Sequence, residues 1–410
     1  MEELVLAERP VWLLLTIAVV AIGFLLFLII KTRLHAFFSL LIVAVLTGLA
    51  AGIGVADVID VVIAGFSSTV GTVALLVGFG AVLGRIIEVT GGAQVLADKM
   101  LDTFGEKRAP LALSVASLFY AFPIFLDAGF IVMLPVIYTV ARRLGGSFML
   151  YVLPSIASFM MMHALLPPHP GPTAAATVMG ADIGLVILVG LLIGLPTWYF
   201  GGYLVARAIS KRFPGTPVPA LLGEPREVPV EERPAFGAIL LVLLMPLVLI
   251  FFNTGFSTME ASGSVSDQNV LYQLSRLVGA TPVAMALSAL TAMLVLYVIP
   301  RRRSGQRVGG LLEELVDDAL APVCSIILIT GAGGAFGRVL TETGIGGQVA
   351  EGLDAMGLPL IIAAYLVTMA MRIAQGSATV AATTGASIIV PAIMAGDFGT
   401  IAVAAVVLAI

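Results

Sequence analysis

The sequence predicts an all-α polytopic membrane protein, built from an inverted-topology repeat with two re-entrant hairpins and broken helices. Three observations predict this class. Of the 410 residues, 60% are hydrophobic and only 11% are charged, whereas soluble domains have about 25% charged residues. Apolar runs of about twenty residues recur, each long enough to cross ~30 Å of hydrocarbon. One segment recurs in the opposite predicted orientation.

Composition also excludes several classes of protein. A surface with so few charges excludes a soluble globular protein, a disordered chain and a coiled coil. The net charge of −4, without a basic stripe, gives no support to nucleic-acid binding. A single cysteine, Cys324, excludes a disulfide framework. We find no nucleophile elbow, zinc-protease motif or phosphate loop, and we expect no cofactor and no metal site.

The apolar runs predict the membrane spans in chain order. The first run, Val11–Ile30, follows an acidic flank and exceeds the apolar core of a signal peptide, so we expect a span there. Further runs lie at about 36–54, 71–90, 148–165, 183–206, 235–254, 278–299 and 319–340. Gly and Pro interrupt the apolar segments around 109–141, 359–395 and 398–410.

The basic residues predict the orientation, because they accumulate on the cytoplasmic side of short loops. Placing every basic cluster inside puts the N-terminus outside and leaves the loops 255–277 and 341–358 on the outer face. The clusters are Lys31/Arg33, Lys99/Lys107/Arg108, Arg142/Arg143, Arg207/Lys211/Arg212/Arg226/Arg233 and Arg301/Arg302/Arg303/Arg307.

This orientation predicts two re-entrant hairpins. Arg108 and Arg142 are both placed inside, yet only 33 residues join them, and two spans need about 40 residues plus a turn. The segment 109–141 is therefore expected to enter from the cytoplasm and return, with its tip at Pro123–Phe130. The segment 359–395 lies between two outer loops, so we expect a second hairpin that enters from outside.

An internal repeat supports this topology. Gly80–Asp98 resembles Gly333–Glu351 at an offset of 253 residues, and both segments precede a predicted hairpin. An inverted repeat with one hairpin from each side is typical of secondary transporters, which bind substrate near the membrane midplane. We predict an N-terminal repeat at 1–206, a Pro-rich cytoplasmic linker at 207–234 and a C-terminal repeat at 235–410.

Two charged residues fall at the hairpin tips. Asp127 is an acid at membrane depth, and such residues are functional candidates because burying them is costly. It is either a proton carrier or a helix cap or ion-pair partner. Arg372 precedes the outer tip, where its guanidinium either binds a substrate carboxylate or pairs with an acid such as Asp127.

Prolines at 167, 168, 170 and 172 predict that the span 148–180 is two half-helices around an unwound centre. His163 and His169 flank this break, and each is either a functional group or a satisfied buried imidazole. Two histidines separated by prolines do not form a recognisable zinc site. The hydroxyls of Thr173, Ser377 and Thr379 are of a kind that binds polyols.

Five segments together resemble the gluconate permease family, which belongs to the ion transporter superfamily. The strings are GRIIEVTGGAQVLADKML (84–101), FPIFLDAGFIVMLP (122–135), HALLPPHPGPTAAA (163–176), ITGAGGAFGRVLTETGIG (329–346) and RIAQGSATVAATT (372–384). The resemblance implies a multi-pass protein of the bacterial inner membrane. It also implies scaffold and transport domains, an elevator motion and a homodimer. Family members continue beyond the position of Ile410, so we expect the C-terminal repeat to be truncated.

These observations together favour proton-coupled uptake of gluconate or a related small hydroxy monocarboxylate. The partners expected are this organic acid, protons and the lipid bilayer. Sodium coupling of a related substrate (glycerate, D-serine or 3-hydroxybutyrate), a membrane-embedded enzyme and a sensor without flux are the alternatives. The candidate substrate- or ion-binding residues are Asp127, Gly129, His163, His169, Pro170, Gly171, Thr173, Arg372, Gln375, Gly376, Ser377 and Thr379.

Overall fold

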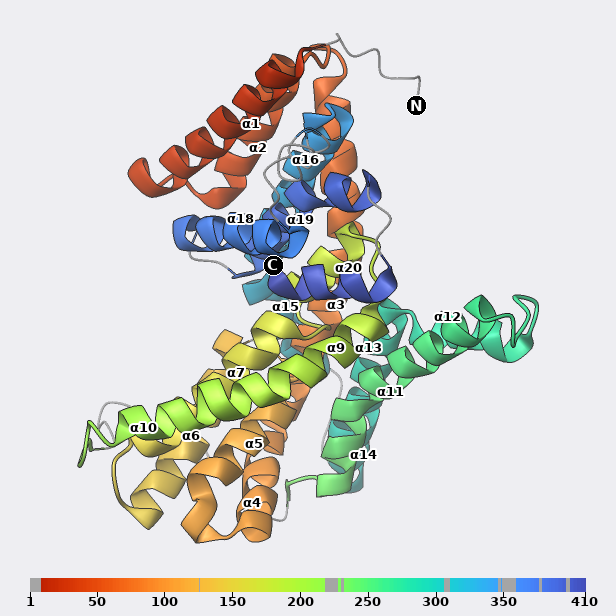
Figure 1. The fold of residues 1–410 in the computed structure, drawn as a ribbon. Coiled ribbons are helices and arrows are strands. Elements are labelled where there is room, and N and C mark those ends of the chain that lie inside the picture. Colours follow the sequence, from red (N-terminus) through yellow and green to blue (C-terminus); the bar gives the residue numbers. More distant parts are fainter. Residues whose placement is uncertain are drawn as a thin grey trace. The chain divides into compact units, whose positions relative to one another are not determined.

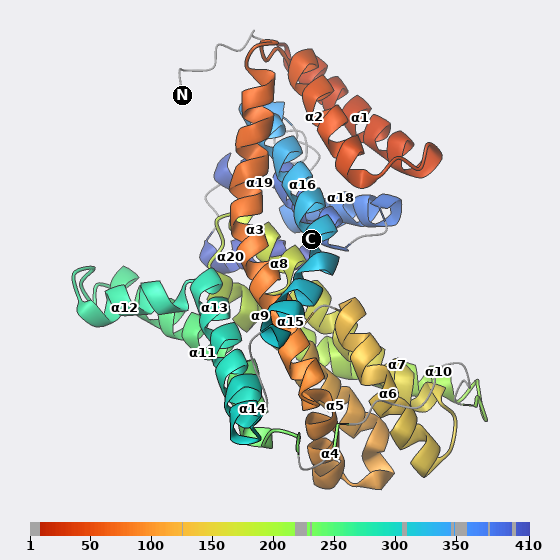
Figure 2. The same cartoon turned by 180° about the vertical axis from the view of Figure 1, so that it is seen from behind.

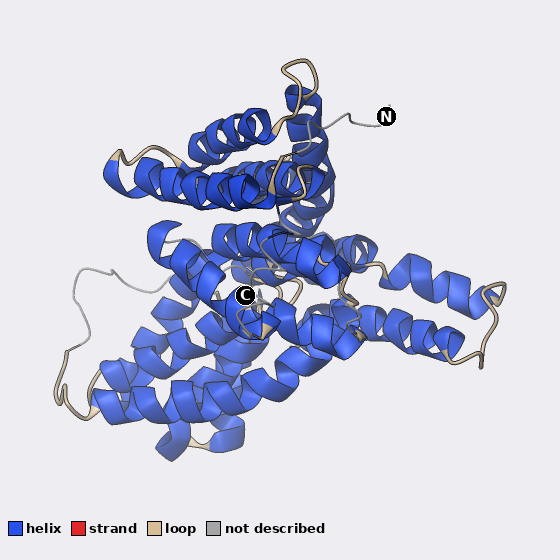
Figure 3. Ribbon diagram, turned by 45° about the horizontal axis from the view of Figure 1, so that its top comes forward, coloured by secondary structure: helices blue, strands red, loops and turns tan. Residues whose placement is uncertain are grey.

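The computed structural model describes residues 9–124, 126–217, 228–229, 232–305, 310–345, 348, 359–375, 378–395 and 399–410. Within these ranges the regular elements are helices and no strand occurs (Figures 1 and 3). Six helical stretches of this described chain are long and apolar enough to cross a membrane, judged by length and composition. The predicted all-α class is confirmed.

The helices follow the predicted apolar runs closely. In the first half they are α1 (Val11–Leu26), α2 (Ala36–Ala51), α3 (Val58–Val89), α4 (Gly92–Phe104), α5 (Ala109–Ala121), α6 (Leu126–Leu144), α7 (Met149–Leu165), α8 (Pro170–Val178), α9 (Ile183–Pro196) and α10 (Val205–Ser210). The π-helical turns η1 (Phe27–Lys31) and η3 (Thr197–Leu204) continue α1 and join α9 to α10.

The second half repeats part of this order. Its helices are α11 (Phe236–Ala261), α12 (Val270–Gly279), α13 (Thr281–Ala292), α14 (Ile299–Arg303), α15 (Leu311–Leu320), α16 (Cys324–Glu342), α18 (Leu360–Gln375), α19 (Ala378–Ala395) and α20 (Thr400–Ala409). The turn η6 (Met293–Val298) joins α13 to α14, and η7 (Ala321–Val323) joins α15 to α16.

Both predicted hairpins are pairs of helices, α5 with α6 and α18 with α19. The 13 residues of α5 rise only about 20 Å at 1.5 Å per residue, which is less than the ~30 Å of a hydrocarbon core. The 19 residues of α6 rise about 28 Å by the same measure, so the re-entrant path of this segment stays a prediction. The predicted broken helix is present too, because α7 ends at Leu165 and α8 begins at Pro170.

The repeat is visible in the helix boundaries. The helix Val58–Val89 and the composite helix Leu311–Glu342 each contain 32 residues, and both of their ends differ by the offset of 253 found in the sequence. Figure 2 shows α3 as a continuous helix. It begins well before the predicted position 71, because the amphipathic stretch that precedes the apolar run belongs to the same helix.

The chain packs as two compact units. The first unit comprises Met1–Leu75, Pro170–Val189 and Cys324–Ile410, and the second comprises Leu76–His169 and Gly190–Val323. Each unit contains segments from both halves of the sequence. This is a division by packing, whereas 1–206 and 235–410 are a division by sequence symmetry, which stays a prediction.

Within each unit, the equivalent helices run antiparallel. In the first unit, a Cβ placed on Gly65 would lie 2.5 Å from Arg338 Cβ, and one on Gly334 would meet Thr69. In the second unit, Arg85 forms an ion pair with Asp318. At the repeat offset Gly65 corresponds to Asp318 and Arg85 to Arg338, so the two contacts are reciprocal. Such reciprocity between equivalent residues is what an inverted repeat predicts.

The close approach of α3 and α16 depends on glycine. We expect Gly334→Ala to lower the free energy of unfolding by about 1–3 kcal/mol, since the added methyl group overlaps Thr69 and the Gly65 carbonyl oxygen. Gly71 is the control, because no atom lies within 4 Å of a Cβ placed there. Thermal unfolding in detergent should show a lower midpoint for Gly334→Ala only. Equal midpoints for both variants would contradict this packing.

One predicted loop is wrong in extent. The outer loop was expected at 255–277, but α11 continues to Ala261 and α12 occupies Val270–Gly279. Asn269 caps α12, since its side chain accepts hydrogen bonds from the backbone N–H groups of Leu271 and Tyr272. Gly279 then lets α12 pack on α11, because a Cβ there would overlap the Leu249 carbonyl oxygen and Asn253. The local cap and this tertiary contact together stabilise a short helix in a segment that looks polar.

Candidate functional site

The turn between α5 and α6, the predicted tip of the first hairpin, packs against α3 in the second unit. A Cβ on Gly80 would lie 3.3 Å from the Pro123 carbonyl oxygen, and one on Gly84 would lie 3.1 Å from Ile124 Cγ1. Both glycines therefore present a surface without side chains to the tip. This contact places α3 beside the turn between α5 and α6.

Two predicted site residues lie in the first turns of α6. Asp127 is the second residue of the helix, and its side chain lies outside the described part of the structure. A carboxylate near a helix N-terminus is stabilised by the helix dipole, so this position fits both a cap and an ionisable carrier. Gly129 is buried, and a Cβ there would lie 2.7 Å from Phe159 Cε1. Gly129 thus has a packing role against α7.

The two histidines of the broken helix lie together in the second unit. Their ring centroids are 5.2 Å apart with an interplanar angle of 68°. His169 is 3% exposed, and its Nε2 lies 2.8 Å from the backbone oxygen of Ala121. Because a carbonyl can only accept, Nε2 must have a proton and donate it. His169 therefore satisfies a carbonyl at the C-terminal end of α5, next to the hairpin tip.

The first unit brings two helix N-termini together. Pro170 begins α8 and Ala378 begins α19. A Cβ on Gly171 would lie 3.4 Å from Thr379 Cα, so the first turns of both helices are in contact. Helix N-termini have unpaired N–H groups and a partial positive charge, which suits an anion.

Buried hydroxyls surround these first turns. Thr173 is 1% exposed and Thr379 is 6% exposed. The Thr173 hydroxyl has no hydrogen-bond partner within the described ranges. Thr384 is fully buried on α19, and its hydroxyl likewise has no partner there. Thr383, by contrast, donates to the carbonyl oxygen of Thr379 at 2.8 Å.

The remaining predicted residues lie at the end of α18. Arg372 is half-buried in its last turn, and no ion pair of this side chain occurs among the described residues. Gln375 ends α18, but its side chain is not described. Gly376 and Ser377 lie outside the described residues. The binding roles of these four residues stay predictions.

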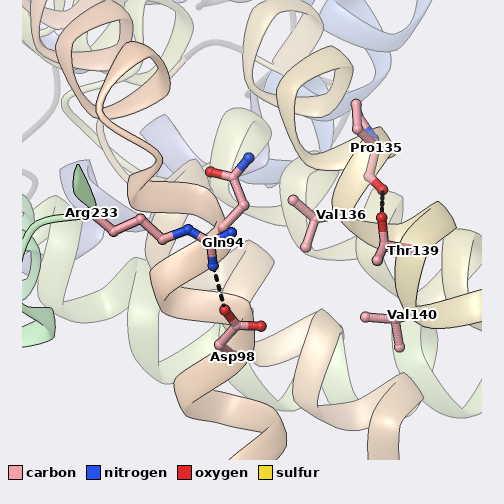
Figure 4. Close-up of a pocket in the computed structure, with 7 residues that line it drawn as sticks. All are labelled: Gln94, Asp98, Pro135, Val136, Thr139, Val140 and Arg233. Atoms are coloured by element: carbon pink, nitrogen blue, oxygen red, sulfur yellow. Dashed lines mark hydrogen bonds and ion pairs between the residues drawn. The ribbon is translucent and has the colours of Figure 1, made fainter. Parts of the chain in front are cut away.

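A pocket of about 50 Å³ lies in the second unit, between α4, α6 and the segment before α11 (Figure 4). Arg233 crosses it and forms an ion pair with Asp98 at 2.9 Å. The Arg233–Asp98 pair has a structural role that attaches the start of the second half to α4.

Sequence reasoning missed the polar residues of α5. The hydroxyls of Ser114 and Ser158 lie 2.8 Å apart, and Trp198 Nε1 donates to both. This buried network joins α5, α7 and η3. Ser117 and Tyr120 follow on the same face, fully buried and without a partner in the described chain. Their spacing of three residues, directly before a hairpin tip, is the signal that could have identified them.

The described residues contain no group of three His, Cys, Asp or Glu side chains that could hold a metal ion. The groups described above in each unit can form hydrogen bonds and can interact with an anion through helix dipoles. Buried hydroxyls, helix N-termini and imidazoles can bind a small polar anion.

Comparison with known proteins agrees with this chemistry. Residues 12–410 match the family model described as GntP family permease. The inner membrane permease YgbN of Escherichia coli K12 is 35% identical over 392 residues, which cover 93% of this chain and 84% of that protein. A gluconate permease of Pseudomonas aeruginosa is 34% identical over 388 residues, covering 94% of this chain and 84% of that protein.

A solved structure gives the same fold. The Alcanivorax borkumensis YdaH transporter, reported as having an unusual topology, aligns with a TM-score of 0.55 at 15% identity, covering 87% of this chain and 76% of that chain. This likeness concerns the fold alone, and it agrees with an all-α membrane transporter. On the family match and the identity to permeases along nearly its whole length, the chain belongs to the GntP permease family and is a transporter rather than an enzyme.

Proposed function

We propose that this protein carries gluconate or a related small hydroxy monocarboxylate across the bacterial inner membrane together with a proton. Three observations on relatives support the substrate and the location. Relatives are named gluconate permease and low-affinity gluconate transporter, another is named an L-idonate transporter, and a further one is an inner membrane permease.

The observation that supports a hydroxy acid most directly is the meeting of the N-termini of α8 and α19. Two adjacent helix N-termini favour the carboxylate of a monocarboxylate over its neutral form. The unpartnered hydroxyl of Thr173 lies in the first turn of α8 and can hydrogen-bond a hydroxyl or carboxylate oxygen of the same ligand. A polar ligand could thus pair with a hydroxyl that has no partner among the described residues.

Proton coupling is proposed through Asp127. Protonation would neutralise this acid, so that substrate and proton cross together with less charge exposed to the low-dielectric interior. Sodium is the alternative coupling ion, since it favours carbonyl and hydroxyl oxygens such as those of Ser377 and Thr379. We further propose that the N-terminus lies outside and that the protein is a homodimer.

Counterflow exchange tests the substrate class. Proteoliposomes loaded with unlabelled gluconate should take up labelled gluconate from outside without any ion gradient. Glycerate, D-serine and 3-hydroxybutyrate, added in turn as competitors, rank the preference for related acids. Absence of exchange with all of these acids would contradict the proposed substrate class, and binding without exchange would indicate a sensor.

A further inference from the structure

Three polar residues lie on one face of α5. Ser114, Ser117 and Tyr120 are spaced three residues apart, and all three are fully buried. Ser114 belongs to the network with Ser158 and Trp198 described above. The hydroxyls of Ser117 and Tyr120, one and two turns further on, have no partner among the described residues. Along α5 toward the turn before α6, one hydroxyl that is hydrogen-bonded is thus followed by two that have no partner among the described residues.

Several buried hydroxyls of the described chain form a hydrogen bond within their own helix, although those of Thr173 and Thr384 do not. Ser155 donates to the carbonyl oxygen of Tyr151 at 3.0 Å, and Ser288 donates to that of Ala284 at 2.7 Å. Ser117 makes no such bond, although its position in a helix would permit it. Because an unpaired buried hydroxyl is destabilising and uncommon in native proteins, two of them on adjacent turns require an explanation.

The residues around Tyr120 include those that contact Gly129 and His169, the predicted site residues of the second unit. Its ring meets the ring of Phe159 edge-on at 6.2 Å, and Phe159 is also the side chain against which Gly129 packs. The next residue, Ala121, accepts the hydrogen bond from His169. Tyr120 therefore lies where the inner hairpin tip meets the end of α7.

A charged pair lies near the same residue. Arg85 and Glu88 of α3 form an ion pair at 2.9 Å, and both charges are close enough to act electrostatically on the Tyr120 hydroxyl. The Nε of Arg85 is buried and has no partner in the described part of the chain. The Nε–H of Arg85 can only donate, and the hydroxyls of Ser117 and Tyr120 can both donate and accept, so an oxygen-rich ligand could pair with all three.

We propose that Ser117 and Tyr120 are specificity-determining residues that hydrogen-bond the oxygen atoms of a hydroxylated carboxylate in transit. This inference rests on the proposed function. A phenol and an alcohol can each donate to a carboxylate and accept from a substrate hydroxyl. A site that hydrogen-bonds substrate hydroxyls discriminates strongly against an acid that lacks them, because the protein groups would then stay unpaired.

The test uses the purified protein and separates binding from stability. For Tyr120→Phe and Ser117→Ala, we expect the ligand-free unfolding midpoint to stay the same or rise, because an unpaired buried hydroxyl is removed. The gluconate concentration that gives half of the thermal shift should rise about 10-fold or more. The preference for gluconate over hexanoate, an acid of equal chain length without hydroxyls, should fall toward one.

Ser114→Ala is the matched control on the same face of α5. It breaks the Ser114–Ser158–Trp198 network, so its ligand-free midpoint should fall while its gluconate affinity stays at the wild-type value. Wild-type affinity and preference in both Tyr120→Phe and Ser117→Ala would overturn the inference. A fall of the ligand-free midpoint in both, without loss of affinity, would overturn it as well. Failure of the wild type to bind any hydroxy acid would instead contradict the proposed function.

Discussion

Asp127→Asn is expected to abolish proton-driven accumulation of substrate while leaving counterflow exchange measurable. Asparagine has the size of aspartate and can hydrogen-bond, but it cannot bind and release a proton at physiological pH. A carrier with this change can still cycle with its substrate, yet the proton gradient no longer supplies free energy for accumulation. Uptake of labelled gluconate into proteoliposomes with an inward pH gradient, compared with exchange in its absence, measures both quantities.

This substitution also separates a proton carrier from a helix cap. Asparagine and aspartate are about equally good helix caps, so an Asp127 that acts only as a cap would tolerate the change, whereas an ion-pair partner would lose stability, which the unfolding midpoint of the purified variant measures. Asp182→Asn is the control, since Asp182 caps α9 by accepting from the backbone N–H of Leu185 at 2.8 Å. Wild-type accumulation in Asp127→Asn would remove this residue from the coupling mechanism.

His169→Ala is expected to reduce the initial rate of uptake by about tenfold or more and to lower stability. The substitution removes a buried ring and leaves the carbonyl oxygen of Ala121 without its donor. An unpaired buried carbonyl costs about 1–3 kcal/mol, and the cavity adds to that cost. This bond joins the segment between α7 and α8 to the last residue of α5. We therefore expect its loss to displace both segments. Uptake rate and thermal midpoint are measured on the same preparation.

Restoring a donor provides the control for His169. In His169→Gln the side-chain amide can again donate to Ala121, so uptake should recover partly. His35→Asn should behave as wild type, because His35 is exposed and only caps α2. Equal uptake rates in the wild type and His169→Ala would show that the hydrogen bond between His169 and Ala121 has no part in transport.

Much of the fold follows from local features of the sequence. The apolar run from Val11 sets the first span, and the prolines at 167 and 168 end α7 because proline has no N–H to donate. The offset between Gly80 and Gly333 identified the equivalent helices, and their boundaries in the structure differ by the same 253 residues. Span length, helix breaking and repetition are encoded locally, so they could be predicted.

The details that escaped prediction depend on tertiary contacts. The helix α12 forms in a predicted loop because Asn269 caps it and Gly279 allows it to pack on α11. The hydroxyls of Ser117 and Tyr120 look like ordinary residues of an apolar helix until burial and the lack of partners are known. The binding roles of candidate residues 375–377 stay predictions, since their side chains lie outside the described structure.

The most direct test of the central claim is uptake of labelled gluconate into proteoliposomes under an imposed pH gradient, in buffers free of sodium. Proton-coupled transport predicts transient accumulation above the external concentration, which a protonophore collapses and which sodium does not increase. Uptake that requires a sodium gradient and does not change with the pH gradient would contradict proton coupling.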